Sequence, residues 1–144
     1  MIITKSEKQT FELGKKLAKK LRGGEVLALS GELGAGKTIL VKGIAAGLGI
    51  KKIITSPTFV LMKVYQLRAR TLKLKANKLV HIDCYRLTNA QAIIDIGAKE
   101  YFNRPDAITV IEWPEKIKEV LPRQKMNIKL SLRHNFNQRE ITLK

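Results

Sequence analysis

Apolar positions recur along the N-terminal third of the chain, first with the period of a helix and then in a short continuous run. Ser6 and Gln9 form a candidate capping box. The helix that follows has an apolar face made of Phe11, Gly14, Leu17, Ala18 and Leu21. The glycine pair at 23–24 predicts the end of this helix. The apolar run 26–30 then predicts a buried strand, and residues 38–48 predict a second helix.

The middle of the chain favours strands over helices. Residues 59–67 are rich in β-forming residues, and residues 71–77 alternate apolar and basic positions. The second of these segments therefore predicts a strand with one wet face, or a hairpin arm paired with 59–67. The run LVHID at 79–83 predicts another buried strand, and Asn89 is a candidate cap for the next helix.

The C-terminal part repeats the alternation of strand and helix and closes with a pair of strands. The run 108–111 predicts a third buried strand that ends at Glu112, and Pro114 suits the first turn of a short helix. Residues 126–132 and 140–143 are expected to form an antiparallel pair. This order predicts an α/β fold with a mostly parallel sheet, flanked by helices, and antiparallel strands added at its edge.

Composition supports one folded domain in a reducing compartment. Hydrophobic residues make up 44% of the chain, and no linker or repeat divides it, so residues 1–144 are expected to form a single domain. No apolar run approaches the roughly 18 residues of a membrane span. The N-terminal segment lacks the apolar centre of a signal peptide, and Cys84 is the only cysteine. We therefore expect a cytoplasmic protein that makes no membrane contact.

Positive charge is concentrated in one long segment of this basic chain, whose formal net charge is +16. No acidic residue occurs between Glu32 and Asp83. The basic residues of that segment are Lys37, Lys42, Lys51, Lys52, Lys63, Arg68, Arg70, Lys73, Lys75 and Lys78. Fields of this kind attract polyanions. The segment predicts contact with RNA, such as tRNA, or with an acidic protein, unless it is only a solvated basic face.

The stretch GELGAGKT at residues 31–38 matches the phosphate-binding pattern G-x-x-x-x-G-K-[ST], between a predicted strand and a predicted helix. Its glycines let backbone amides turn toward a phosphate, and the helix N-terminus adds positive potential. Lys37 can reach the β- and γ-phosphates, and the hydroxyl of Thr38 can ligate Mg²⁺. The candidate nucleotide-binding residues of this loop are Gly31, Glu32, Leu33, Gly34, Ala35, Gly36, Lys37 and Thr38. The sequence has no guanine-recognition motif N-K-x-D, which favours ATP.

Two acidic residues are placed to complete a metal site. Asp83 and Glu112 each end a predicted buried strand, and open α/β sheets bind ligands at the C-terminal ends of their strands. One carboxylate could ligate Mg²⁺, and the other could orient the attacking water or contact the hydration shell of the metal. A helix cap or a surface ion pair is the structural alternative for either. His81, two residues before Asp83, is interpreted as a structural group.

Three further motifs follow the glycine loop: TSPTF at 55–59, HIDCYRL at 81–87 and VIEWPEK at 110–116. With GELGAGKT they make the chain resemble the bacterial TsaE family, also called the YjeE family, over nearly its whole length. The resemblance implies a P-loop NTPase fold. It also implies an ATPase that supports the threonylcarbamoyladenosine modification of tRNA, by driving the cycle of the TsaD–TsaB complex.

The resemblance also implies residue roles around the metal. Thr38 and Glu112 would ligate Mg²⁺, residues 34–38 would hold the phosphates of ATP, and Asp83 would be an essential acid beside the metal. Lys37, Asp83 and Glu112 are therefore the candidate catalytic residues, and Thr38, Glu112 and Asp83 are the candidate metal ligands.

Further roles concern the two ends of the nucleotide. By the same resemblance, Thr10 would lie near the base, and Thr58, with Ser56 and Pro57, would lie near the γ-phosphate. Trp113 would lie close to the site, with core packing as the alternative explanation. The family does not need so basic a segment as residues 68–78, so the surface that meets partners stays open.

Two other functions are compatible with the loop. A small-molecule kinase fits its size, but the sequence shows no Arg-rich lid segment with an acceptor pocket. A basic nucleic-acid-binding module, with nucleotide only as a ligand, fits the segment that lacks acidic residues, and it is compatible with the ATPase.

Overall fold

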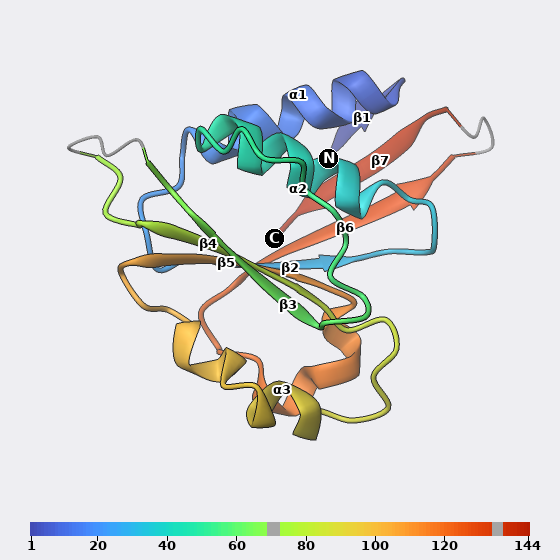
Figure 1. Cartoon of the computed structure of the whole chain (residues 1–144). Coiled ribbons are helices and arrows are strands. Elements are labelled where there is room, and N and C mark those ends of the chain that lie inside the picture. The colour runs from blue at the N-terminus through green and yellow to red at the C-terminus, as the bar shows by residue number, and fades with distance from the viewer. Residues whose placement is uncertain (69–72, 134–136) are drawn as a thin grey trace.

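Over the residues described, the chain forms a seven-stranded sheet with helices on both faces (Figure 1). The computed structural model describes residues 1–68, 73–133 and 137–144. In chain order the elements are β1 (Ile2–Thr4), α1 (Glu7–Ala18), β2 (Val26–Ser30), α2 (Lys37–Gly47), β3 (Met62–Gln66), β4 (Lys78–Asp83), α3 (Gln91–Asp95), the 3-10 helix η1 (Ala98–Tyr101), β5 (Ala107–Glu112), the 3-10 helix η2 (Pro114–Val120), β6 (Met126–Leu132) and β7 (Arg139–Leu143).

The sheet has a parallel centre and antiparallel edges. Its strand order is β1-β7-β6-β2-β5-β4-β3. β2 pairs in parallel with β6 and with β5, and β5 pairs in parallel with β4. β3 joins one edge antiparallel, and β7 and β1 join the other in the same way. The predicted α/β class, with antiparallel strands added at the edges of a parallel sheet, is confirmed.

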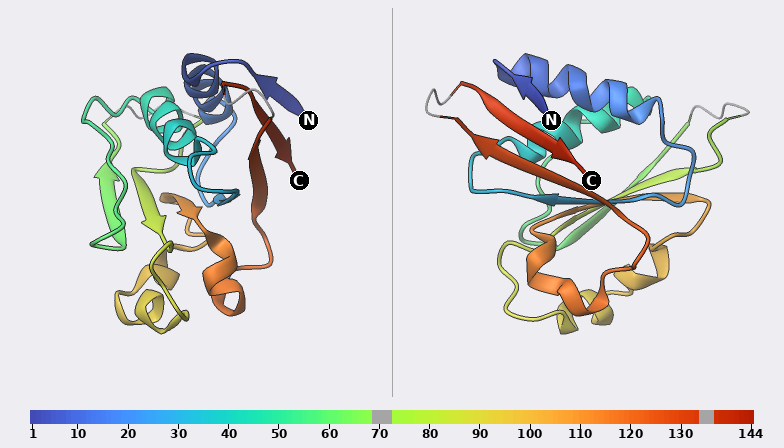
Figure 2. Two further views of the ribbon diagram at one scale, coloured as in Figure 1. Left: turned by 90° about the vertical axis from the view of Figure 1, so that its right-hand side faces the viewer. Right: turned by 180° about the vertical axis from the view of Figure 1, so that it is seen from behind.

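Helices cover both faces of the sheet, and the sheet separates the core into two clusters (Figures 1 and 2). α1 and α2 pack on one face, over side chains such as Leu27, Leu29 and Ile108. α3, η1 and η2 lie on the other face, over side chains such as Val80 and Ile82. The central strands are buried on both faces, and this explains why they appear in the sequence as continuous apolar runs.

The central strands occupy the runs that predicted them. β2, β4 and β5 begin within one residue of the predicted runs, and β6 and β7 form the predicted antiparallel pair. β1 was not predicted. Its three residues pair with β7, and a strand of this length is too short to show a period in the sequence.

The prediction for residues 59–77 was wrong in its pairing. β3 begins only at Met62, and it pairs antiparallel with β4 rather than with 71–77. Residues 73–77 form no strand, and residues 71 and 72 lie outside the described part of the chain. β5 pairs with only one edge of β4, and β3 satisfies the backbone groups of the other edge, which would otherwise be unpaired.

α1 begins as predicted and ends earlier. The hydroxyl of Ser6 accepts a hydrogen bond from the Gln9 amide at 3.2 Å. The Gln9 side chain accepts from the amide of Lys5 at 2.7 Å, one residue before the position that a capping box requires. The helix ends at Ala18, although Leu21 beyond it is buried.

The other helices differ from the predictions only at their ends. α2 begins one residue before the predicted start and ends one residue before the predicted end. The Asn89 side chain accepts a hydrogen bond from the amide of Gln91 at 2.9 Å, although Ala90 occupies the N-cap position of α3. Pro114 begins η2, which is kinked at Ile117. None of the helices within the described ranges is both long enough and apolar enough to span a membrane.

Candidate functional site

The parallel strands bring three chain segments to one end of the sheet. β2 leads into the glycine loop, β4 ends at Asp83 and β5 ends at Glu112. Asp83 and Glu112 are direct partners in the parallel register of β4 and β5. The two predicted carboxylates and the phosphate-binding loop therefore meet at the C-terminal edge of the sheet, where open α/β folds bind ligands.

The glycine loop has a backbone shape that other residues adopt only with strain. Gly31 has a φ of 142°, and a Cβ there would lie 2.2 Å from the carbonyl oxygen of Leu130. Gly36 caps α2 with a φ of 95°. Glycine at these two positions therefore lets the loop pack against β6 and β7, and loops of this shape can bind a phosphate at the N-terminus of the helix that follows.

Lys37 lies folded into its own loop. Its Nζ donates to the carbonyl oxygens of Gly31 at 2.6 Å and Glu32 at 2.9 Å, and it lies 4.0 Å from the centre of the Trp113 ring. Burial lowers the pKa of Lys37, and the negative charges of nearby carboxylates, Glu112 first, oppose this shift. A cation held only by neutral groups can exchange them for the oxygens of an anion.

Thr38 and Glu112 form the second contact of the site. The Thr38 hydroxyl lies 3.1 Å and 3.2 Å from the two carboxylate oxygens of Glu112. Nε2 of His81 donates to the Oε1 atom of Glu112 at 2.8 Å, and both side chains are buried. The carboxylate of Glu112 is therefore held from two sides, by a hydroxyl at the loop and by an imidazole beneath it.

Asp83 is held by the segment that precedes β3. Its Oδ2 accepts from the hydroxyls of Ser56 at 2.5 Å and Thr58 at 2.9 Å, and its Oδ1 accepts from the amide of Tyr85 at 2.9 Å. The sequence motifs that contain Ser56, Thr58 and Asp83 thus form one hydrogen-bonded group. This group lies beside Glu112, and within the described ranges no hydrogen bond joins its side chains to the Glu112 carboxylate.

These groups surround a cavity of about 380 Å³. Its walls are formed by Glu7, Leu33, Gly34, Gly36, Lys37, Thr38, Ile39, Ser56, Thr58, Asp83, Tyr85, Glu112 and Trp113. Most of the predicted site residues are among them. Trp113 has a φ of 58°, and its ring packs on that of Tyr85 with centroids 5.0 Å apart, so it forms a wall of the cavity as well as part of the packing.

Four predicted binding residues lie behind the cavity. Gly31 and Glu32 contribute the carbonyls that hold Lys37, and the Glu32 carboxylate accepts from the amide of Leu132 at 2.9 Å. Ala35 is fully buried. The Thr10 hydroxyl bonds that of Thr4 at 2.8 Å, so the proposed role of Thr10 near the base stays a prediction.

Four residues at or beside the site had no role in the sequence analysis: Tyr85, Glu7 and Ile39 line the cavity, and Arg139 lies behind the glycine loop. Tyr85 belongs to the HIDCYRL motif, which was the available signal for it. Glu7 lies in the first turn of α1 and forms an ion pair of 3.5 Å with the buried Arg139 of β7. Nε of Arg139 has no partner among the described residues, and it lies close to Gly36. No local pattern distinguishes Glu7 or Arg139 from surface charges.

The arrangement suits a nucleotide with Mg²⁺. The loop offers amides and the cation of Lys37 to phosphates, and Thr38 and Glu112 present oxygen ligands side by side. Within the described ranges, no cluster of three or more His, Cys, Asp or Glu side chains forms a metal cage. Mg²⁺ usually takes one or two protein ligands and completes its shell with phosphates and water, so the pair of Thr38 and Glu112 could hold it.

Comparisons with known proteins agree with the geometry. The family model described as "Threonylcarbamoyl adenosine biosynthesis protein TsaE" matches residues 4–141. The tRNA threonylcarbamoyladenosine biosynthesis protein TsaE of Treponema pallidum is 40% identical, over 98% of this chain and 97% of its own. The protein of that name from Bacillus subtilis is 37% identical, over 96% of this chain and 81% of its own. The crystal structure of Bacillus subtilis YdiB has a TM-score of 0.76 at 32% identity, covering 99% of this chain and 82% of that one. The chain therefore belongs to the TsaE family.

Proposed function

We propose that this protein is a Mg²⁺-dependent ATPase that supports the N6-threonylcarbamoyladenosine modification of tRNA. The observation that carries the proposal is the meeting of Thr38 and Glu112, at 3.1 and 3.2 Å, at the N-terminus of α2 beside Lys37. P-loop ATPases hold Mg²⁺ with a hydroxyl and a carboxylate, and they hold the phosphates with a lysine.

Each residue then has a distinct task. Lys37 would exchange its two loop carbonyls for phosphate oxygens, and Thr38 and Glu112 would hold Mg²⁺. A bound Mg²⁺ would supply positive charge against the phosphates. Asp83 is the acid beside the metal that orients the attacking water, and the hydroxyls of Ser56 and Thr58 hold it in place.

The role in tRNA modification is supported by the family and by the names of its curated members. We further propose that residues 1–144 act as one ATPase domain in the cytoplasm. There, ATP hydrolysis would drive the cycle of a TsaD–TsaB-like complex between its turnovers. Slow hydrolysis alone and faster hydrolysis in the complex would follow if contact with the partner completes the site.

The test measures phosphate release from ATP, with Mg²⁺, for the protein alone and with TsaD and TsaB. Wild-type hydrolysis should rise when the partners are added. Asp83→Asn should bind ATP within about threefold of wild type and lose about a hundredfold in hydrolysis, because only proton and water positioning is removed. Glu112→Ala should weaken both Mg²⁺ dependence and turnover.

Asp95→Asn is the matched control, because this exposed carboxylate on α3 bonds only the Gln91 side chain among the described residues. It should hydrolyse ATP as wild type does. Hydrolysis that ignores TsaD and TsaB would refute the proposed role in their cycle. Transfer of the labelled phosphate to a metabolite rather than to water would identify a kinase instead.

A further inference from the structure

A second cavity, larger than the one at the glycine loop, lies at the β3 edge of the sheet. It has a volume of about 800 Å³. One wall is the chain that follows α2, residues 49–52, and the other is the second half of β3 together with Arg68. Figures 1 and 2 show the chain after α2 running back alongside β3 before it enters that strand. We call this cavity the β3 groove.

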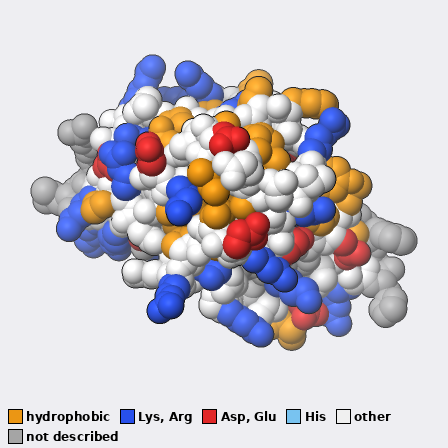
Figure 3. All heavy atoms as spheres, turned by 90° about the horizontal axis from the view of Figure 1, so that it is seen from below, with side chains coloured by type: hydrophobic (Ala, Val, Ile, Leu, Met, Phe, Trp, Pro, Cys, Tyr) orange, Lys and Arg blue, Asp and Glu red, His pale blue; other side chains and the backbone are white. Residues whose placement is uncertain are grey.

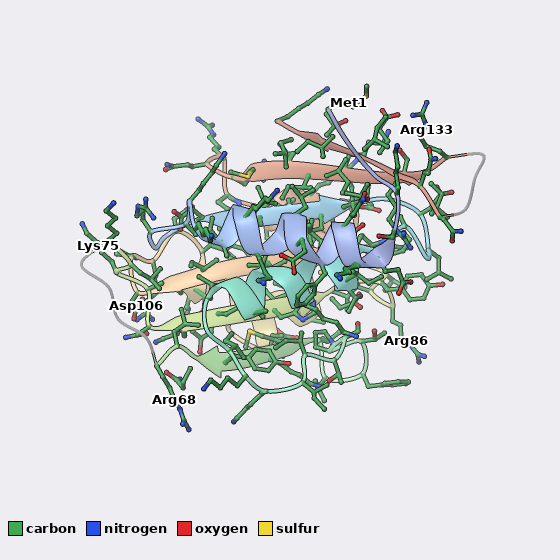
Figure 4. The ribbon with its side chains drawn as sticks, turned by 90° about the horizontal axis from the view of Figure 1, so that it is seen from above. Met1, Arg68, Lys75, Arg86, Asp106 and Arg133 are labelled. Atoms are coloured by element: carbon green, nitrogen blue, oxygen red, sulfur yellow. The ribbon has the colours of Figure 1, made fainter. Side chains whose placement is uncertain are left out.

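The β3 groove is remote from the nucleotide site. β3 is antiparallel to β4, and its register places Met62 opposite Ile82, next to Asp83, but Gln66 opposite Lys78 at the far end of β4. The half of β3 that lines the groove is therefore the half that points away from Asp83. Figure 4 shows Arg68 at one end of the molecule and Arg86, which follows Asp83 by three positions, at the other. Binding in the groove thus needs no contact with bound nucleotide.

The groove exposes the free edge of a strand. The Leu61 carbonyl accepts from Asp83 and the Leu67 amide donates to Asn77, so the odd-numbered residues of β3 face β4. Bonding alternates along an antiparallel strand, so the amides and carbonyls of Val64 and Gln66 point outward. Among the described residues, no hydrogen bond from outside the sheet reaches those groups. An open edge of this kind is a template for another strand.

The walls of the groove are positively charged. Lys51, Lys52 and Arg68 line it and are exposed, and no acidic residue is among the described lining. None of these three cations forms an ion pair with another described residue. The face that carries α3 differs, because acidic and basic side chains are interspersed there (Figure 3). The uncompensated charge favours an anionic partner at this edge.

We propose that the β3 groove binds a short, extended, acidic segment of a protein partner, which adds as a strand to the outer edge of β3. The backbone groups of Val64 and Gln66 supply the hydrogen bonds, and Lys51, Lys52 and Arg68 pair with its carboxylates. Strand addition of this type takes affinity from the backbone and specificity from flanking side chains. The site does not depend on the proposed ATPase activity.

The outward backbone groups favour a peptide over single-stranded RNA. Proteins bind unpaired bases chiefly by stacking them on exposed aromatic rings. The only aromatic residue in the described lining is Tyr65, which is partly buried and packs against the core under α1 and α2. RNA would use the cations of the groove but not its strand edge, and this difference separates the two partners by experiment.

The test uses a fluorescein-labelled peptide of alternating valine and glutamate, with fluorescence anisotropy as the readout on the full chain. The comparison probes are the same peptide with lysine for glutamate and a uridine oligonucleotide of equal length. The glutamate peptide should bind about tenfold or more tightly than the lysine peptide, because charges of one sign repel. It should also bind more tightly than the oligonucleotide.

Two variants separate the contribution of backbone hydrogen bonds to peptide affinity from that of the lysine charges. Val64→Pro removes an outward N–H that β4 does not use, so the sheet tolerates it and peptide affinity should fall roughly threefold to tenfold. The double variant K51E/K52E should lower it about tenfold or more. K116E/K118E makes the same charge change at exposed positions of η2 and should bind within about twofold of wild type.

ATP binding, followed by the fluorescence of Trp113, should be equal in all three variants and shows that each is folded. The proposal is overturned if the glutamate peptide fails to bind, or if Val64→Pro binds it as wild type does while ATP binding is retained. It is also overturned if the oligonucleotide binds more tightly and responds to K51E/K52E but not to Val64→Pro. That last pattern would make the groove an RNA site.

Discussion

The contact between Lys37 and Trp113 should allow ATP binding to be followed by tryptophan fluorescence. The Lys37 ammonium lies 4.0 Å from the ring of Trp113, the only tryptophan of the chain. When Lys37 turns to a phosphate, the charge over the ring changes, so ATP binding should change the tryptophan fluorescence. Lys37→Ala should weaken ATP binding about a hundredfold, because a charged, partly desolvated contact is lost.

Lys42→Ala, on the exposed side of the same helix, is the control and should bind ATP as wild type does. Fluorescence titrations of both variants with ATP measure the difference. Equal affinities for Lys37→Ala and wild type would mean that the lysine serves the ligand-free loop and not the nucleotide.

His81 is expected to position Glu112 for the metal. Its Nε2 bonds Oε1 of Glu112 at 2.8 Å, while its Nδ1 has no partner among the described residues, so the carboxylate is the only polar contact of the ring. Partners behind a metal ligand typically contribute tenfold to a hundredfold in metal affinity. His81→Leu should therefore reduce the gain in ATP affinity that Mg²⁺ produces by about tenfold.

His81→Gln keeps a donor near the position of Nε2 and should restore most of that gain. The measurement is the ATP affinity of each variant with and without Mg²⁺. If His81→Leu lowers both affinities equally, or neither, the histidine serves packing alone.

Sequence patterns located the individual site residues better than their contacts. The glycine loop is a contiguous motif, and Asp83 and Glu112 each follow an apolar run, so local sequence patterns are enough to identify them. His81 was interpreted as a structural group, and no local pattern indicated its bond to Glu112, which lies 31 positions later at the end of the neighbouring strand. Which residues meet across the sheet depends on the register of strand pairing, and no local segment of the sequence determines that register by itself.

At the scale of elements, α1 and α2 pack through glycines. A Cβ on Gly43 would lie 2.1 Å from the carbonyl oxygen of Phe11, and one on Gly14 would lie 2.5 Å from that of Leu40. Gly43→Ala should therefore push the helices apart and lower the free energy of unfolding by about 1–3 kcal/mol. This holds although alanine favours an isolated helix by about 1 kcal/mol.

Urea unfolding of Gly43→Ala measures the loss. Lys42→Ala, at the exposed neighbouring position, should stay within about 0.5 kcal/mol of wild type. A Gly43→Ala variant as stable as wild type would show that the two helices can separate without cost.

Elements that are buried on both faces were predicted best. The strands β2, β4 and β5 give continuous apolar runs because helices cover both sides of them. The edge strands were harder to predict: β1 has only three residues, and β3 has exposed or half-buried side chains throughout. Whether such a segment forms a strand depends on the strand that it pairs with. The neighbour of β3 proved to be β4 and not the alternating segment 71–77.

At the scale of the whole molecule, the sequence indicated the fold class but not the order of the strands. The closing pair was predicted as antiparallel, yet nothing in it indicated that β6 also lies parallel to β2 at the centre of the sheet. This placement makes the last strands part of the core rather than an appendage. It also sets Arg139 of β7 behind the glycine loop.

The shared strands lead to the expectation that residues 1–144 unfold as one unit. The two core clusters lie on opposite faces of the same central strands, so neither can lose its packing without exposing the other. Cys84 reports on one cluster, because its thiol is fully buried and burial raises its pKa to about 12. At pH 8 an alkylating reagent should therefore label it only when the chain opens.

Three probes then follow different parts of the molecule: Trp113 fluorescence at the site, far-ultraviolet circular dichroism of the helices, and labelling of Cys84 beneath α3. Across a urea titration their midpoints should coincide, as they do for a two-state domain. Cys84→Ala should lose the labelling signal and keep the other two coincident. A fluorescence transition that precedes the loss of helix would mean that the nucleotide end unfolds alone, and residues 1–144 would then not be one cooperative domain.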